Sequence, residues 1–244
     1  MMVGILSQIV EFRNGESGQH VQHIKMLTGF LLDRLMQKTD KYDLKWSDQY
    51  MITIASALHD IGKVGIDEKI LNKPGRLTNE EFEEMKKHTL IGASMLKSLG
   101  VYQNEELVKV AYQICRWHHE RYDGKGYPDG LKGEEIPIAA QVVSVADVYD
   151  AMTSNRCYRK GICPFKVIGI LEQDKDAYEP GVLYLFMERT IEAYVNTEVL
   201  LSNGEQGKVV LLNKSLLSRP VVMTDKGTIY DLSKDFRMSI EALI

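Results

Sequence analysis

The stretch HHERYDGKGYP, residues 118–128, places two imidazoles side by side and follows them with two glycines and a proline. Neighbouring residues on a helix point about 100° apart, so His118 and His119 cannot both face one apolar contact. Both can reach metal ions if the helix ends here, and we expect them to bind different ions. Gly124 and Gly126 permit backbone conformations or close approaches closed to other residues. Taken alone, this loop would indicate only a tight turn.

A second set of candidate metal donors is His59-Asp60, in the segment ALHDIGKVGI at the end of an apolar helix. Alone, such a pair indicates only a hydrogen bond at a helix end. Imidazole nitrogen suits transition metals, however, and a carboxylate can bridge two ions. Lys63 follows His59 by four residues and lies on the same side if helical geometry continues. A lysine there could hold a phosphate oxygen, although a solvated surface charge is its ordinary role.

Three further segments carry metal-binding residue types. His88, in MKKHTLIGASML, would alone be read as a boundary histidine. Asp147 lies in the apolar run VVSVADVYDAMTS, and a buried carboxylate needs a partner, which a metal or an ordinary salt bridge would supply. Glu16 and His20 are four residues apart, a spacing that also occurs by chance. Because such donors recur at the ends of five predicted helices, together they favour a metal cluster.

The sequence predicts mostly helices over residues 1–196, and these helices must position the candidate donors. Thr78 has the pattern of a helix N-cap, with Glu81 at the capping-box position. Pro137 stands at a helix start, where its missing N–H costs least. Apolar spacing predicts the other helical segments at 5–12, 21–35, 46–58, 94–99, 105–117 and 138–152.

The pattern changes near Asn196. The segments VLLSNGEQGKVVLLN and RPVVMTDKGTIYDL have β-branched runs interrupted by Asn-Gly, Gln-Gly and Lys-Gly, which are strand and turn signals. We therefore expect a mainly α protein with two parts, a helical domain at 1–196 that carries the candidate donors and a small β-rich appendage at 197–244. The appendage contains no histidine, so we expect it to supply no metal ligand.

Composition narrows the class of protein. The 244 residues are 44% hydrophobic and 26% charged, with a formal net charge of −4, so no overall basic field favours a nucleic acid polymer. Cys115, Cys157 and Cys163 form no CxxC pair, and an odd count indicates a reducing, cytoplasmic setting. No stretch approaches the ~18 apolar residues of a membrane span, and the N-terminus lacks the pattern of a signal peptide.

The motifs HDIGK, KPG, HHExxDGxGYP and VADVYDAMTSxR occur in this order, and with them the chain resembles the HD-GYP subfamily of the HD phosphohydrolase superfamily. HDIGK alone would indicate only the superfamily, and DGKGYP makes the assignment specific. The likeness runs from about Glu11 to Glu188. It implies an all-helical HD core, a cluster of two or three iron or manganese ions, and hydrolysis of a cyclic dinucleotide, chiefly cyclic di-GMP, to linear pGpG or GMP.

The resemblance also implies roles for individual residues. Asp60 matches the bridging aspartate, Lys63 the phosphate-contacting lysine, and Arg156 an arginine that meets the substrate phosphate. Arg159 and Tyr127 are further candidates for substrate contact. Having both Glu16 and His20 favours a three-ion site. The ligands that the resemblance implies are Glu16, His20, His59, Asp60, His88, His118, His119 and Asp147.

The sequence departs from the family pattern at three places. Cys157 replaces the usual proline of the RPYR segment, His23 replaces a frequent arginine, and DAYEPGVL is a loose version of the GxxFDPxxV segment. No ligand position is lost, which favours catalysis: two metals would activate a hydroxide for attack at phosphorus, with Lys63 and Arg156 stabilising the developing charge. Two alternatives stay open, hydrolysis of a mixed GMP–AMP cyclic dinucleotide and a non-catalytic nucleotide-binding signalling module. The open partners are a second copy of the chain and a sensory or receiver domain.

Overall fold

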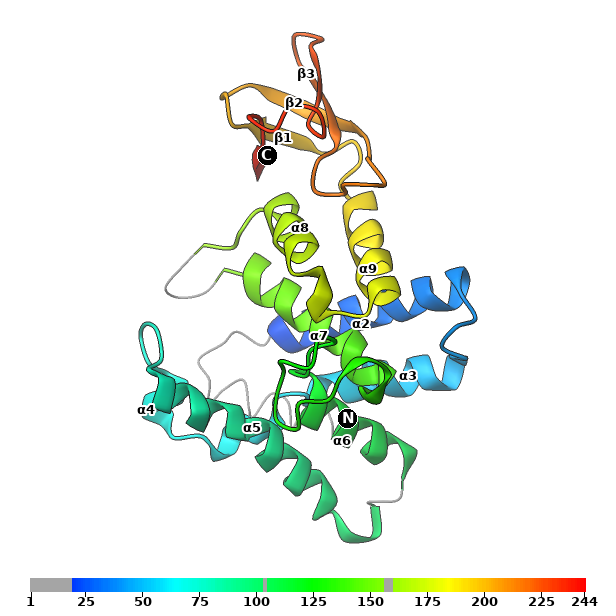
Figure 1. Ribbon diagram of the computed structural model, residues 1–244, viewed down its shortest axis with the longest axis vertical. Coiled ribbons are helices and arrows are strands. Elements are labelled where there is room, and N and C mark those ends of the chain that lie inside the picture. Colours follow the sequence, from blue (N-terminus) through cyan, green and yellow to red (C-terminus); the bar gives the residue numbers. More distant parts are fainter. Residues whose placement is uncertain (1–18, 103–104, 156–159) are drawn as a thin grey trace.

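The computed structural model of the protein describes residues 19–102, 105–155 and 160–244. Eight α-helices are seen in this part of the chain, and the sheet that follows them lies at one end of the long axis, beyond α8 and α9 (Figure 1). The helices are α2 (Gln19–Lys38), α3 (Trp46–Ala55), α4 (Glu68–Leu71), α5 (Asn79–Lys97), α6 (Glu106–Trp117), α7 (Ile138–Thr153), α8 (Pro164–Gln173) and α9 (Pro180–Glu192).

Helix α7 is the central element of the helical core. It packs against α2, α6, α8 and α9. Its Val142, Val143, Val145 and Ala146 are fully buried, so it is apolar on more than one side, as a helix surrounded by others must be. Helix α2 shows the expected one-sided stripe, whose buried residues are Val21, Ile24, Thr28, Leu31, Leu32 and Leu35. The part of the chain that is described contains no helix of the length and apolarity needed to cross a membrane.

Helix α5 begins as its sequence predicts. The Thr78 hydroxyl accepts from the Glu81 backbone N–H, and the Glu81 carboxylate accepts from the Thr78 N–H. The helix then continues unbroken to Lys97, so the helical stripe predicted at 94–99 is the last turn of α5 as far as Lys97. The predicted helix at 46–58 is α helix only to Ala55 and ends in a 3₁₀ turn, η1 (Ser56–Leu58).

The C-terminal strands form one antiparallel sheet with the order β4-β3-β2-β1-β5. The strands are β1 (Glu198–Leu201), β2 (Gln206–Leu211), β3 (Val221–Thr224), β4 (Ile229–Asp231) and β5 (Ile240–Leu243). Gly204 and Gly227 have positive φ and serve in turns, as predicted, whereas Gln206-Gly207 lies within β2. The fold class predicted from sequence, mainly α with a small C-terminal sheet, is therefore confirmed.

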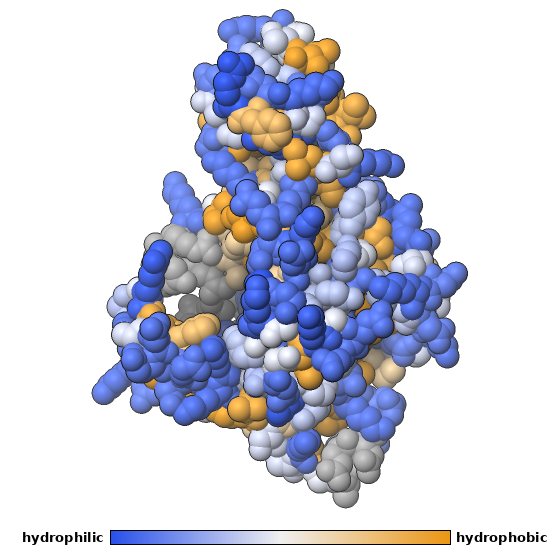
Figure 2. Space-filling view, in the orientation of Figure 1, coloured by the Kyte–Doolittle hydropathy of each residue, from blue (hydrophilic) through white to orange (hydrophobic). Residues whose placement is uncertain are grey.

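The sheet shares a hydrophobic core with the helices next to it. Val199, Leu201 and Val209 belong to the same cluster of buried side chains as Ile168 of α8 and Ile191 of α9. On the face shown in Figure 2, apolar side chains are interspersed among hydrophilic ones on both the helical part and the sheet. The division into parts at residue 196 stays a prediction.

Candidate metal centre

The adjacent histidines stand where a helix ends, as the sequence predicts. Helix α6 stops at Trp117, and His118 is its C-terminal cap. Gly124 has φ +79°, a conformation that side chains rarely adopt. A Cβ on Gly126 would lie 2.4 Å from the Cα of Glu120, so only glycine lets the loop pass this close to the chain that carries the histidines.

The HDIGK segment is a chain of 3₁₀ turns rather than a continued helix. His59 caps η1, and Asp60 precedes the next turn, η2 (Ile61–Gly65). A Cβ on Gly62 would lie 1.9 Å from the carbonyl oxygen of His88, so this glycine allows η2 and α5 to touch. That close approach brings His88 beside Asp60, although the two are 28 positions apart in sequence.

The first group of donors is His88, His118 and His119. One ligand atom from each lies within 4.8 Å of the others. His88 Nδ1 is 2.7 Å from the Met85 carbonyl oxygen, and His118 Nδ1 is 2.9 Å from that of Ile114. A ring whose Nδ1–H donates to a carbonyl leaves its Nε2 lone pair for a metal. The two adjacent histidines thus meet in one group, and their binding to different ions stays a prediction.

The second group of donors is His20, His59 and Asp147, whose ligand atoms also lie within 4.8 Å of one another. Asp147 Oδ1 is 3.6 Å from His20 Nε2 and 3.8 Å from His59 Nε2. The His59 Nδ1 lies 2.8 Å from the Ser56 carbonyl oxygen. This contact orients the His59 ring in the same way that the Met85 carbonyl orients the His88 ring.

Asp60 lies between the two groups. Its Oδ1 is 3.4 Å from His88 Nε2 and 4.0 Å from His118 Nε2, and its Oδ2 is 3.2 Å from His59 Nε2. Lys63 Nζ is 2.6 Å from the same Oδ2, so the 3₁₀ turn aims this lysine at Asp60. One carboxylate oxygen thus faces each group, which is the arrangement that a bridging ligand requires.

Several buried polar atoms of this cluster have no hydrogen-bond partner among the residues that the structure describes. They are the Nε2 atoms of His59, His88 and His118 and the Oδ1 of Asp60. Unpaired buried polar atoms are costly and uncommon, and here they converge on the same small region. Imidazole nitrogen with carboxylate oxygen is a donor set that suits transition metals. These residues therefore fit a cluster of metal ions.

The electrostatics of the cluster keep most of its imidazoles neutral. Burial lowers the pKa of His118 to about 3, and burial with the nearby histidines holds the pKa of His119 well below its usual range. Burial also lowers the pKa of His88. Burial raises the pKa of Asp60, but Lys63 and His59 outweigh it and keep the carboxyl ionised. Neutral imidazoles and an ionised carboxylate are the forms that bind metals.

Tyr127, expected near the substrate, lies against the first group. Its ring stacks on that of His119, with centroids 4.8 Å apart. On its other side it meets Phe82 edge to face, and the Lys86 ammonium lies 5.4 Å from its centroid. The sequence therefore identified a residue that adjoins the cluster. Glu16, Arg156 and Arg159, together with Cys157, lie outside the residues that the structure describes.

The idea that donors stand at helix ends held only in part. His20 is in the first turn of α2, and His118 directly follows α6. His88, however, lies in the middle of α5, and Asp147 lies in the middle of α7. Both helices pass the cluster with their central turns.

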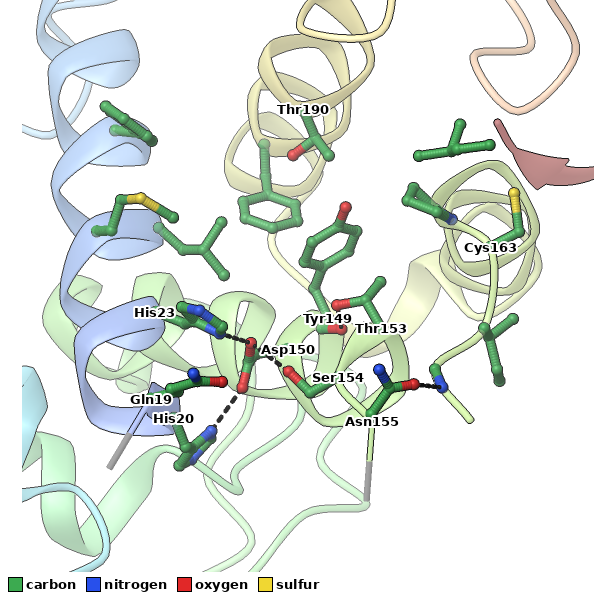
Figure 3. Close-up of a pocket in the computed structure, with 18 of the residues that line it drawn as sticks. Gln19, His20, His23, Tyr149, Asp150, Thr153, Ser154, Asn155, Cys163 and Thr190 are labelled. Carbon is green, nitrogen blue, oxygen red and sulfur yellow. Dashed lines mark hydrogen bonds and ion pairs between the residues drawn. The ribbon is translucent and has the colours of Figure 1, made fainter. Parts of the chain in front are cut away.

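Two acidic residues that the sequence analysis missed support the site. Asp150 Oδ2 lies 2.6 Å from His20 Nδ1, and its Oδ1 lies 2.9 Å from His23 Nδ1 and accepts from the Ser154 hydroxyl (Figure 3). Asp150 is thus the group that orients His20. Its sequence signal was its position three residues after Asp147 in the same apolar run, which places both carboxylates on one face of α7.

Glu120 is the other missed residue. Its side chain is buried, and its carboxylate accepts from the backbone N–H groups of Asp129, Gly130 and Leu131. These three bonds hold the end of the GYP loop against the histidine pair. Its signal in the sequence is an acid that directly follows two histidines in HHE.

Comparison with known proteins agrees with the fold. The family model described as "HD domain" matches residues 5–182. A protein of Vibrio cholerae named "Probable cyclic di-GMP phosphodiesterase" is 38% identical over 191 residues, which is 76% of this chain and 43% of that protein. Another from the same organism, named "3'3'-cGAMP-specific phosphodiesterase 2", is 36% identical over 184 residues, covering 75% of this chain and 33% of the relative.

Comparison with solved structures supports the fold. A protein described as HDG"Y"P from Bdellovibrio bacteriovorus superposes with a TM-score of 0.50 at 20% identity, covering 68% of this chain and 50% of that one. The chain spans less than half of the length of the two curated relatives above. Because the family model covers most of the chain, the protein belongs to the HD domain family, and it shares its fold with this HDG"Y"P protein.

Proposed function

We propose that the protein is a metal-dependent phosphodiesterase that hydrolyses cyclic di-GMP to linear pGpG or GMP. The observation that carries this proposal is the position of Asp60, with one oxygen toward each of two groups of candidate metal donors. A site built for two or more ions beside a lysine suits a phosphate ester. The name of the Vibrio cholerae relative at 38% identity supports the choice of substrate.

The residues that would hold the ions are those of the two groups together with Asp60. We expect two or three iron or manganese ions, with Glu16 and His20 serving the third. Such ions, when bound, supply Lewis acidity toward phosphate oxygens and make a nucleophilic water available near neutral pH. The proposed ligands are Glu16, His20, His59, Asp60, His88, His118, His119 and Asp147.

The other proposed roles belong to side chains that meet the substrate. Lys63, held 2.6 Å from Asp60, brings a positive charge to the edge of the cluster, where charge develops on the phosphoryl oxygens during in-line displacement. Tyr127 forms an aromatic wall beside His119. Arg156 and Arg159 would supply forked donors for phosphate oxygens. Asp150 holds the His20 ring in place through Nδ1.

A second candidate substrate is a mixed GMP–AMP cyclic dinucleotide. The observation in its favour is the relative at 36% identity that is named for 3'3'-cGAMP. The two substrates share the phosphodiester chemistry and differ only in one base, so the metal cluster does not separate them. A nucleotide-binding module without turnover is the remaining alternative, and the complete set of ligand residue types disfavours it.

The test is a turnover assay combined with a count of metal ions. The protein is purified without oxygen, loaded with Fe(II) or Mn(II), analysed for metal, and incubated with each dinucleotide, and products are separated by chromatography. We expect at least two ions per chain and hydrolysis of cyclic di-GMP. If the folded, metal-loaded protein leaves both dinucleotides intact, the proposal that it is an enzyme is refuted. If it binds one ion or fewer per chain, the proposal of a metal cluster is refuted.

We further propose that the protein works in the cytoplasm, since Cys115 and Cys163 are free thiols. We expect no nucleic acid polymer as partner. The curated relatives are more than twice as long as the matched region, which supports a sensory or receiver domain as a partner, alongside a homodimer.

A further inference from the structure

A cavity of about 1570 Å³ leads from the candidate metal centre toward the C-terminal sheet. His20 and Asp150 line it at one end, and Glu241, Ala242 and Leu243 of β5 line it elsewhere. In Figure 3 the side chains around His20 gather at one end of the pocket, and Thr190 of α9 lies away from them. Ligand pockets commonly measure ~300–1,000 Å³, so this cavity has room for far more than one phosphate group.

One face of α2 forms a continuous wall of this cavity. His20, His23, Leu27 and Phe30 all line it, and their spacing of three, four and three residues keeps them on the same side of the helix. At 1.5 Å per residue, Phe30 stands about 15 Å beyond His20 along the helix axis. The wall therefore runs from a proposed metal ligand to an aromatic ring across a length that suits a dinucleotide.

The Phe30 end of the wall has the features of a platform for a flat ring. Phe30 is 46% exposed and Met26 is 50% exposed, although both line a cavity. Arg189, on α9, lines the same cavity, and its guanidinium carbon lies 5.7 Å from the Phe30 ring centroid. Aromatic rings and arginine planes are the groups on which proteins stack nucleobases. Apolar side chains left open inside a pocket indicate a ligand surface.

We propose that Phe30 and Arg189 form a stacking platform for one purine base of a cyclic dinucleotide whose scissile phosphodiester lies at the metal centre. This inference rests on the proposed function and adds to it a subsite for the base farther from the metals. The competing explanation is an ordinary surface contact. Arg219 and Phe236 provide one for comparison, with a distance of 4.8 Å, and neither is among the described residues that line the cavity.

The experiment compares Phe30→Ala, Phe30→Trp and Phe236→Ala in the full chain loaded with Mn(II). Two substrates are used, cyclic di-GMP and bis(p-nitrophenyl) phosphate, which has no purine. Loss of one stacked base should raise KM for cyclic di-GMP roughly tenfold in Phe30→Ala. Hydrolysis of bis(p-nitrophenyl) phosphate should stay within about twofold, and Phe30→Trp and Phe236→Ala should resemble the unmodified protein.

An unchanged KM for cyclic di-GMP in Phe30→Ala would overturn the inference, and so would an equal loss on both substrates, which would mark a structural defect. Calorimetric titration of the metal-depleted protein with cyclic di-GMP separates this failure from failure of the proposed function. Binding without hydrolysis that weakens about tenfold in Phe30→Ala would support the base subsite while refuting the enzyme. Neither binding nor hydrolysis by the unmodified protein would overturn both.

Discussion

Replacing Asp60 by asparagine should change the protonation of His59 in the metal-free protein. His59 is completely buried, and burial lowers its pKa. The carboxylates of Asp60, 3.2 Å from Nε2, and Asp147, 3.8 Å away, outweigh burial and raise that pKa to about 9. In Asp60→Asn the burial stays and the nearer charge is removed, so the pKa of His59 should fall to 6.5 or lower.

The size of this effect follows from the two pKa values. One pKa unit corresponds to about 1.36 kcal/mol, so a fall from about 9 to 6.5 corresponds to about 3.4 kcal/mol. Because the folded pKa lies above the unfolded value, protonated His59 stabilises the metal-free fold fully below pH 6.5. That stabilisation is lost as pH rises from 6.5 through about 9. A metal must displace the proton, so metal affinity should increase over the same interval.

The test uses chelator-treated protein and its Asp60→Asn variant. The pKa of His59 is measured in each by following the imidazole NMR signals with pH, and the free energy of unfolding in urea is measured at pH 6.5 and at about pH 9. Asp123→Asn is the matched control. This carboxyl, in the GYP loop, accepts from the Arg121 guanidinium, which lowers its pKa to about 2. The reasoning is refuted if His59 already titrates at or below pH 6.5 in the unmodified protein, or if Asp60→Asn leaves its pKa unchanged.

Three further predictions concern the substrate, the loop and the sheet. Arg156→Ala should keep its metals but lose roughly 1.5–3 kcal/mol in kcat/KM, and Arg156→Lys should recover only part of this; unchanged hydrolysis at low substrate would remove Arg156 from the site. In Glu120→Gln only one carbonyl oxygen remains to accept from three N–H groups, so the free energy of unfolding in urea should fall by about 1–3 kcal/mol. A urea midpoint equal to that of the unmodified protein would contradict this. Truncation after Asn196 should leave metal content per folded chain unchanged in elemental analysis, whereas a still-helical fragment without metal would count against it.

Patterns contained within one segment were predictable from the sequence. Thr78 and Glu81 predict the start of α5, because together they form a capping box that spans four residues. The end of α6 before His118 and the tight loop after it follow from two histidines and two glycines in one short stretch. The strands after Asn196 follow from alternating β-branched residues, as in β3, where Val222 and Thr224 are buried and Met223 is exposed.

Features that depend on how helices cross were not predictable. Nothing in the sequence around His88 shows that the middle of α5, rather than its end, meets the HDIGK turn. That contact exists because Gly62 has no Cβ and lets the His88 backbone approach. The grouping of His118 with His119 depends in the same way on where α5 places His88.

Four imidazoles of the two donor groups have an Nδ1 contact, and they differ in how far along the sequence the contacted residue lies. His59, His88 and His118 are each oriented by a carbonyl three or four residues earlier in their own turn or helix. These rings are set as soon as the local chain folds. His20 instead depends on Asp150, 130 residues away on α7. The group of His88, His118 and His119 therefore needs α5 and α6 to meet. The group of His20, His59 and Asp147 is complete only when α2 packs against α7. Loosening of α2 would therefore disrupt the group that contains His20 before the other.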